Sequence, residues 1–323
     1  MKAYSDKVDY KNLFVPLKKL GEGSFGKVYL VKQKDAGKYY AMKVLSKSRI
    51  YQNDIAKYIL TERKVQSTIK SRFIVKIHCA FQTKSKLFMI MDYCPGGDLR
   101  TALKTNRKFT EPQAKIYAAE VLLALEELHK QKIIHRDLKL DNVVLDKNGH
   151  ALLTDFGLSK KGIQLGDNTG TFCGTMQYLA PEILEGLGHG HSVDWYLFGT
   201  FLYEMIVGYP PFFDRNRNQV KTREKNLNIP ESMSPEASDI IVKLLNNNPK
   251  KRLGAGVRDA EEIKAHVFFN NINWEKAAEG KLKPPKPYIN QVVKVESLED
   301  VYEDNEVDVR DRLDGWSFRG KRI

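Results

Sequence analysis

Hydrophobic residues form short, strand-like runs in the first third of the chain and longer helical patterns after it. Runs rich in β-branched and aromatic residues predict strands at 13–15, 28–31, 39–45, 73–79 and 87–91. One helix is predicted within this part, over 54–70, because Ile55, Ile59, Val65 and Ile69 lie on overlapping faces. A sheet-forming part of the chain therefore precedes a mainly helical part.

Two helices stand out in the second part. Thr110 can cap a helix that has Glu111 and Pro112 in its first turn, and an apolar stripe follows at Tyr117, Val121, Leu125 and Leu128. Residues 193–206 are apolar almost all round, yet the segment is too short and too acidic to cross a membrane. This pattern predicts a core helix, which Gly208 and the pair Pro210-Pro211 end.

Length and composition allow one large domain or two lobes. The chain has 323 residues, of which 42% are hydrophobic. The three cysteines, Cys79, Cys94 and Cys173, lack metal-ligand spacing and are expected to be reduced thiols. We find no signal peptide or membrane-spanning segment, so a soluble protein of the cytoplasm, and of the nucleus as a second compartment, is expected.

The net charge of +13 is unevenly distributed, because residues 296–323 carry nine acids and five bases. A basic body is compatible with nucleic-acid binding. However, the sequence contains no cysteine-histidine finger, basic heptad helix or aromatic RNA-binding signature. We favour a solvated basic surface that also attracts ATP, and expect no DNA or RNA partner.

A polar octet, residues 135–142, lies between the apolar stretches 133–134 and 143–145. This context predicts a loop held between two buried elements. Within it, Asp137 could accept a proton from a hydroxyl, Lys139 could neutralise a phosphoryl group, and Asn142 could bind a metal. The alternative is a surface turn with ordinary charges. The triplet Asp155-Phe156-Gly157 begins thirteen residues after Asn142, and the presence of both motifs disfavours an ordinary surface turn.

These two motifs resemble the catalytic core of protein kinases. The resemblance implies an α+β bilobal fold, with a small antiparallel sheet lobe carrying one regulatory helix and a larger, mainly helical lobe. It divides the chain into an N-terminal extension (1–12), a kinase domain (13–269) and a C-terminal extension (270–323). Within the kinase domain it places the small lobe at 13–91, the hinge at 92–97 and the large lobe at 98–269.

The resemblance also implies MgATP as the phosphoryl donor. The Gly-x-Gly-x-x-Gly segment 21–26 joins two predicted strands, as in kinases, and Glu62 follows Lys43 by nineteen residues, which fits the kinase lysine–glutamate pair. Implied Mg²⁺ ligands are Asn142 and Asp155, and implied catalytic residues are Asp137, Lys139, Lys43, Glu62 and Thr175. Implied ATP contacts are Leu20, Gly21, Glu22, Gly23, Ser24, Phe25, Gly26, Val28, Ala41, Lys43, Met91, Asp92, Cys94, Asp98 and Thr154.

The C-terminal part is similar to the tail of AGC kinases. The segments 266–275, 284–287 and 313–318 match its pattern, and residues 171–175 are similar to protein kinase B and the ribosomal-protein kinases. Lys139 and Thr175 indicate serine or threonine targets. Asp98, Asp141 and Glu204 match positions that receive substrate arginines, so protein substrates with basic residues before the target are expected. Glu182 is expected to pair with Arg252 for structural reasons.

The resemblance further implies control by phosphorylation at Thr171 and Ser317. A phosphate on Thr171 would meet Arg136 and Lys160, with Tyr58 where relatives often have a histidine. Neither target has arginine three residues upstream, so an upstream activating kinase is expected. A monomer without an attached lipid-binding domain is expected. A pseudokinase scaffold and a nucleic-acid binder remain as alternatives.

Overall fold

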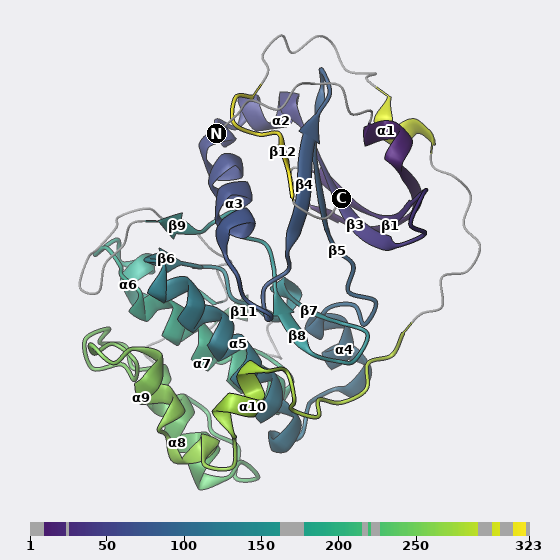
Figure 1. Ribbon diagram of the computed structural model, residues 1–323. Coiled ribbons are helices and arrows are strands. Elements are labelled where there is room, and N and C mark those ends of the chain that lie inside the picture. The colour runs from purple at the N-terminus through teal and green to yellow at the C-terminus, as the bar shows by residue number, and fades with distance from the viewer. Residues whose placement is uncertain are drawn as a thin grey trace. The chain divides into compact units, whose positions relative to one another are not determined.

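The computed structural model describes residues 10–23, 26–161, 178–214, 219–220, 227–289, 299–303 and 313–320, and the chain divides into two compact units (Figure 1). The first unit comprises the described residues up to Thr68, Val75–Cys94 and the described residues after 290. The second comprises Ile69–Ile74 and the described residues from Pro95 to Ile289. The predicted site residues Ser24, Phe25, Thr171 and Thr175, and most of the predicted N-terminal extension, lie outside the described residues.

The first unit is built on a six-stranded sheet in which every neighbouring pair is antiparallel. In sheet order the strands are β1 (Phe14–Gly23), β2 (Gly26–Gln33), β3 (Tyr39–Ser46), β5 (Lys86–Asp92), β4 (Ile77–Gln82) and β12 (Phe318–Arg319). The last strand comes from the C-terminal segment, and its Phe318 pairs with Ala80 of β4. The sheet therefore joins residues that are more than two hundred positions apart in sequence.

The strand predicted at 73–79 is present, but its predicted bounds are too early. The strand β4 begins at Ile77 and continues to Gln82. Residues 73 and 74 instead contact β8 (Ala151–Leu153) of the second unit, where Phe73 O accepts the Leu153 N–H and Ile74 forms an isolated bridge to Leu153. The apolar residues Phe73 to Val75 lie directly before the strand, so the sequence pattern does not mark where β4 begins.

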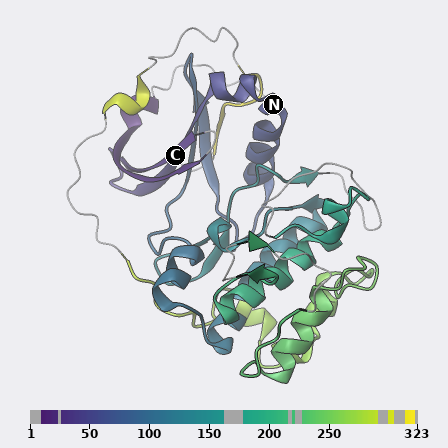
Figure 2. The same cartoon turned by 180° about the vertical axis from the view of Figure 1, so that it is seen from behind.

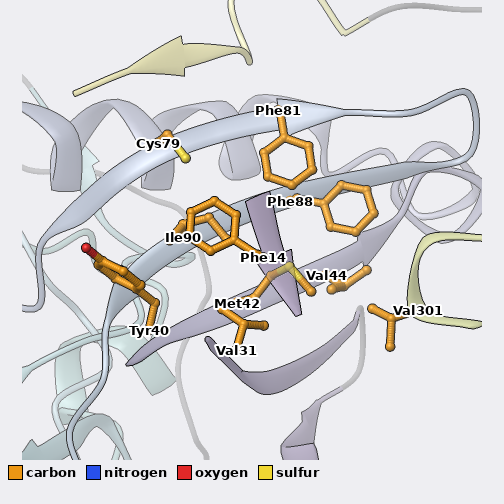
Figure 3. Packing of buried hydrophobic residues seen from close by; sticks show 10 residues of the cluster. All are labelled: Phe14, Val31, Tyr40, Met42, Val44, Cys79, Phe81, Phe88, Ile90 and Val301. Carbon is orange, nitrogen blue, oxygen red and sulfur yellow. The ribbon is translucent and has the colours of Figure 1, made fainter. Parts of the chain in front are cut away.

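Buried side chains from the strands pack into one hydrophobic cluster (Figure 3). Phe81 stacks on Phe88 with ring centroids 4.7 Å apart, and Phe14 meets Tyr40 edge-on at 5.8 Å. Val301, from the short 3₁₀ helix η3 (Glu299–Tyr302), completes the cluster. The C-terminal segment thus contributes to the core of the first unit as well as to its sheet.

The helices of the first unit are α1 (Tyr10–Leu13), α2 (Lys47–Gln52) and α3 (Ala56–Thr68). The helix predicted over 54–70 is α3, which lies beside β4 in both views (Figures 1 and 2). The sequence analysis expected one helix here and missed α2, which Ser46 caps by accepting the Arg49 N–H at 3.4 Å. The small-lobe prediction is therefore correct in its sheet and incomplete in its helices.

The second unit is mainly helical. Its α-helices are α4 (Leu99–Asn106), α5 (Glu111–Lys130), α6 (Pro181–Leu184), α7 (Ser192–Val207), α8 (Pro235–Leu244), α9 (Ala260–Lys264) and α10 (Trp274–Ala278). Its 3₁₀ helices are η1 (Leu140–Asn142) and η2 (Val267–Phe269). Its strands form the antiparallel pairs β6 (Ile133–Ile134) with β9 (Lys160–Lys161), β7 (Val143–Leu145) with β8, and β10 (Phe213–Asp214) with β11 (Gln219–Val220). With the sheet of the first unit, this confirms the predicted α+β bilobal fold.

Helices α5 and α7 supply the core of this unit. The start of α5 is capped as predicted, with the Thr110 N–H donating to Gln113 Oε1 at 3.0 Å, and its predicted stripe is buried. All but the last residue of α7 is buried, and Gly208 ends it at φ 95°, a conformation that favours glycine. Within the described residues, we find no helix with the length and hydropathy needed to cross a membrane.

The predicted ion pair between Glu182 and Arg252 is confirmed. The two Arg252 terminal nitrogens donate to the two Glu182 carboxylate oxygens at 2.7 and 2.9 Å, and both side chains are buried. Arg252 also donates to the Ser192 carbonyl oxygen at 2.8 Å. Because the charges are paired and hydrogen-bonded, their burial is tolerated, and the pair ties α6 to the start of α7.

Candidate active site

In the first unit, Lys43 and Glu62 form the ion pair that their spacing predicted. Lys43 lies on β3 and Glu62 on α3, and Lys43 Nζ is 2.5 Å from Glu62 Oε1. The Glu62 side chain is almost fully buried, which makes a charged partner necessary. The pair fixes the direction of the Lys43 ammonium group, as required of a group that binds phosphate oxygens.

The glycines of the 21–26 segment have two different roles. Gly26 pairs with Leu45 of β3, and a Cβ atom there would lie 2.0 Å from the Val44 carbonyl oxygen, so only glycine fits. Gly21 and Gly23 are exposed on β1, and a Cβ atom at either would meet nothing within 4 Å. The protein's own packing therefore does not require these two glycines, which is compatible with a ligand approaching their backbone.

Sheet register brings several predicted ATP contacts together. Val28 of β2 pairs with Lys43, and Ala41 of β3 pairs with the buried Met91 of β5. At the end of β5 the Asp92 N–H donates to the Lys76 carbonyl oxygen at 3.0 Å, and Cys94 is half-buried. Backbone groups of Asp92 and Cys94 are predicted to pair with the adenine edge, and this pairing stays a prediction.

In the second unit, the loop at 135–137 is held by the carboxylate of Asp194 on α7. Asp194 accepts the backbone N–H groups of His135 and Arg136, each at 2.8 Å, and the His129 Nε2–H at 2.9 Å. Arg136 has φ 69°, an unusual value for a residue other than glycine. The two backbone hydrogen bonds come from Arg136 and the residue before it, and they stabilise the strained backbone immediately before Asp137.

His129 is completely buried between Asp194 and Asp259. Burial opposes its charged form, but hydrogen bonds to the two carboxylates outweigh burial and raise the pKa of His129 to about 9. Burial also opposes ionisation of Asp194, yet its hydrogen bonds from His129 and the Arg136 N–H lower the Asp194 pKa. The group that holds the loop is therefore an ionised carboxylate with a charged histidine beside it.

Asp137, Lys139 and Asn142 converge within this loop. Asp137 Oδ2 accepts hydrogen bonds from Lys139 Nζ at 2.8 Å and from Asn142 Nδ2 at 2.9 Å. Asn142 Nδ2 also donates to the Asp137 carbonyl oxygen at 2.8 Å. The structure thus brings together three residues that the sequence assigned to proton acceptance, charge neutralisation and metal binding.

Asn142 and Asp155 are brought near each other by the β7–β8 pair. Val143 pairs with Leu153, and the Thr154 N–H donates to the Asn142 carbonyl oxygen at 2.9 Å. Asp155 has φ 60° and an exposed carboxylate. Because Asn142 uses its amide nitrogen on Asp137, its amide oxygen would be the ligand atom for the predicted metal. One carboxylate oxygen and one amide oxygen fit Mg²⁺, which prefers oxygen ligands and retains water or phosphate in its other positions.

Phe156 is a packing residue. Its side chain is fully buried, and its ring meets that of His135 edge-on, with centroids 5.1 Å apart. The His135 ring lies 3.3 Å from the Thr154 carbonyl oxygen, measured from Nε2. The His-Arg-Asp and Asp-Phe-Gly segments are therefore packed against each other through these two rings.

Arg136 is a buried cation that lies immediately before Asp137 in the chain. Its Nε donates to the Leu158 carbonyl oxygen at 2.6 Å, while its buried Nη1 has no hydrogen-bond partner among the described residues. Burial and then the positive charge of Arg136 lower the pKa of His189 to about 4, and Lys160 acts in the same direction. An unsatisfied buried guanidinium nitrogen is compatible with binding an anion such as a phosphate. Tyr58, predicted for the same role, is an exposed residue of α3 in the first unit.

The three predicted acidic residues have partners within the protein. Asp98 caps α4, its Oδ1 accepting the Thr101 N–H at 2.7 Å. Arg100 donates from Nε to Asp141 Oδ2 at 3.1 Å and from Nη1 to Glu204 Oε1 at 2.5 Å. Arg100, in the first turn of α4, was not predicted from the sequence, because its partners are distant in the chain. Asp194 and His129 were missed as supports for the catalytic loop.

The C-terminal segment 313–320 docks on the first unit. Trp316 is fully buried, its Nε1–H donates to the Phe81 carbonyl oxygen at 2.8 Å, and its own carbonyl oxygen accepts the Arg63 Nε–H at 2.9 Å. The Arg63 guanidinium also lies over the Phe318 ring, 5.1 Å from its centroid. Ser317, between the two aromatic residues, is exposed. The geometry leaves the serine accessible while its neighbours are held.

Comparison with known proteins agrees with this arrangement. Residues 14–269 match the protein kinase domain family. Over 294 residues the chain is 43% identical to RAC-beta serine/threonine-protein kinase A of Xenopus laevis, which covers 90% of this chain and 60% of the relative. It is 48% identical over 268 residues to protein kinase 2 of Dictyostelium discoideum, covering 82% of this chain and 55% of the relative.

A third relative is ribosomal protein S6 kinase alpha-1 of Homo sapiens, 44% identical over 297 residues that cover 90% of this chain and 40% of the relative. The chain thus spans well under two thirds of the length of these relatives. The match to the kinase domain nevertheless extends over most of this chain and includes both groups of site residues described above. The chain therefore belongs to the protein kinase family, in the AGC branch that its C-terminal motifs resemble.

Proposed function

We propose that this protein transfers the γ-phosphoryl group of MgATP to serine or threonine side chains of proteins that carry basic residues before the target. The observation that carries the proposal is the convergence of Lys139 Nζ and Asn142 Nδ2 on Asp137 Oδ2, at 2.8 and 2.9 Å. A carboxylate held in this way, on a loop held by Asp194, is suited to orient a hydroxyl nucleophile.

In the proposed reaction the target hydroxyl oxygen forms a bond to the γ-phosphorus while the bond from that phosphorus to the β–γ bridging oxygen breaks. Asp137 accepts the hydroxyl proton, and Lys139 offsets negative charge on the transferred group. Lys43, positioned by Glu62, binds the non-transferred phosphates. Bound Mg²⁺ neutralises phosphate charge, and Asn142 and Asp155 would hold it.

The switch that we propose first is phosphorylation of Thr171 by another kinase. Thr171 lies outside the described residues, so the support comes from its predicted binding partners. Arg136 Nη1 is buried without a hydrogen-bond partner among the described residues, and Arg136 and Lys160 both lower the pKa of His189. A phosphate group bound there would satisfy Arg136 and act directly on the residue that precedes Asp137.

Ser317 is proposed as a second switch. It is exposed, whereas Trp316 before it is buried against Phe81 and Phe318 after it pairs in the sheet. Arg63 contacts this segment from α3, the helix that also carries Glu62. Added charge on Ser317 would therefore alter a segment that contacts the helix positioning Lys43.

We further propose a monomer that acts in the cytoplasm and the nucleus.

Phosphate transfer from MgATP to a serine/threonine peptide library tests the central proposal. Transfer is expected from the wild type phosphorylated at Thr171, and Asp137→Asn should abolish it because the amide cannot accept the proton. Nucleotide binding without transfer in any sample would favour the scaffold alternative. Salt-sensitive RNA or DNA binding without ATP turnover would favour a nucleic-acid binder.

A further inference from the structure

Arg100 occupies the acidic pair formed by Asp141 and Glu204. Its Nε donates to Asp141 Oδ2 at 3.1 Å, and its two terminal nitrogens donate to the two carboxylate oxygens of Glu204 at 2.5 and 3.2 Å. Arg100 Nη2 also donates to the Tyr178 hydroxyl, which itself donates to Glu204 Oε2 at 2.6 Å. A guanidinium has five N–H groups, and these contacts use all three of its nitrogens.

This cluster is largely closed to solvent on the Glu204 side. The Glu204 side chain is 1% exposed and that of Arg100 21% exposed, whereas that of Asp141 is 49% exposed. Burial opposes the charged form of Arg100, but the hydrogen bond to Glu204 and its charge outweigh burial and raise the Arg100 pKa. Burial and then the Glu204 charge also raise the Tyr178 pKa, so its hydroxyl stays protonated. Arg100 is thus a permanent cation in this cluster.

The charge that an incoming peptide would meet is therefore reduced. Asp141 and Glu204 alone would present two negative charges, and Arg100 leaves a net charge of one, located at the exposed Asp141. A second guanidinium could reach the oxygens of Glu204 only by displacing Arg100, and it would meet the like charge of Arg100 during its approach. Such juxtaposition of like charges disfavours a ligand.

The position of the cluster connects it to catalysis. Asp141 lies in η1, four residues after Asp137 on the same loop. A polypeptide whose hydroxyl is oriented by Asp137 would therefore place neighbouring residues close to Asp141. On the basis of the proposed function, we propose that Arg100 is a specificity-determining residue. Its guanidinium occupies both carboxylate oxygens of Glu204 and one carboxylate oxygen of Asp141. The enzyme therefore accepts targets with a single upstream arginine and does not require a second.

The test measures preference for arginine with serine peptides that have alanine or arginine at each of five upstream positions, singly and in pairs. Both the peptide Kd and kcat/KM are measured for wild type, Arg100→Ala, Arg100→Gln and Arg100→Ala/Glu204→Gln. Lys104→Ala, which removes an exposed positive charge from the same helix, is the matched control. The arginine-to-alanine ratio is formed within each variant, so a reduced folded fraction cancels.

Arg100→Ala is expected to raise this ratio by about ten- to a hundredfold at one upstream position, the worth of one charged hydrogen-bonded pair. Arg100→Gln should act in the same direction if the alanine variant fails to fold. Glu204→Gln in the double variant should return the ratio to the wild-type value, and Lys104→Ala should not change it.

Ratios that are equal in wild type and both Arg100 variants, by Kd and by kcat/KM, would overturn the assignment of Arg100. An equal rise in Lys104→Ala would also overturn it, because the effect would then come from net charge. Loss of turnover in every sample with the change in Kd ratio intact would instead refute the proposed kinase activity and leave the Arg100 assignment standing.

Discussion

Asp194 accepts the backbone N–H of His135 at 2.8 Å, and this bond helps to link the buried helix α7 to the loop that carries Asp137. The carboxylate is fully buried and ionised, so its oxygens act as fixed acceptors for the loop. Support for the reactive carboxylate therefore comes from a residue 57 positions later in the sequence that has no contact with substrate in the proposed mechanism.

Replacing this support should impair both folding and catalysis. Asp194→Asn retains the volume but substitutes an amide NH₂ for one acceptor, which leaves His129 or a backbone N–H without its partner. We expect the free energy of unfolding to fall by about 3–5 kcal/mol, as for other broken buried pairs. Denaturant unfolding measures this loss, and kcat should fall with KM for ATP nearly unchanged. Wild-type stability of Asp194→Asn would contradict the role of the carboxylate.

His129 makes the stability of the protein sensitive to alkaline pH. Its pKa of about 9 in the folded protein exceeds the ordinary value of 6.5, so its contribution is complete below pH 6.5 and is lost as pH rises through 9. The stability difference between wild type and His129→Gln should therefore shrink by up to about 3 kcal/mol between pH 6.5 and 9.5. Urea unfolding at several pH values measures it. A difference that stays constant would show that His129 is neutral in the folded state.

Alanine substitutions at two glycines of the 21–26 segment should have different effects, one on ATP binding and the other on stability. Gly21→Ala meets nothing within 4 Å, so its stability should stay within about 0.5 kcal/mol of wild type, while KM for ATP rises severalfold. Gly26→Ala places a Cβ 2.0 Å from the Val44 carbonyl oxygen and should lower stability by about 1–3 kcal/mol. Calorimetric Tm and ATP kinetics compare the pair. Equal losses of Tm in Gly21→Ala and Gly26→Ala would refute the different roles of these two glycines.

Docking of the C-terminal segment should depend on Trp316 and not on the hydroxyl of Ser317. Trp316→Ala removes a fully buried ring and its hydrogen bond to Phe81, and should lower the stability of the first unit by about 3 kcal/mol. Ser317→Ala changes an exposed side chain and should leave unphosphorylated protein within about 0.5 kcal/mol. Hydrogen exchange at the backbone amides of β4 measures undocking directly, because β12 of the C-terminal segment pairs with β4. Unchanged exchange in Trp316→Ala would argue against docking.

The family and the fold class were predictable because motifs of fixed spacing mark them. The pairing of Lys43 with Glu62 and of Glu182 with Arg252 was likewise predicted from the sequence. A lysine in an apolar strand requires a partner of opposite charge, and the family resemblance identified Glu62 as that partner. The resemblance alone implied the pairing of Glu182 with Arg252. The roles assigned to the individual ATP, Mg²⁺ and catalytic residues remain predictions.

What the sequence did not predict depends on contacts without a local pattern. Arg100 meets Asp141 and Glu204, which are 41 and 104 positions away, so nothing in the neighbourhood of α4 indicates its partners. The start of β4 was placed too early because the apolar residues Phe73 to Val75 precede it without a break. Helix α2 is only six residues long, and a single Ser46 cap is a weak signal.

The pairing of β12 with β4 has a consequence for solubility. Without Phe318 and Arg319, β4 would be the outer strand of the sheet, with hydrophobic residues and unpaired backbone groups open to other chains. Such open edges favour aggregation by intermolecular strand pairing. The C-terminal segment thus covers the β4 edge of the sheet. Any event that releases this segment exposes β4 to strand pairing with a second copy of the protein.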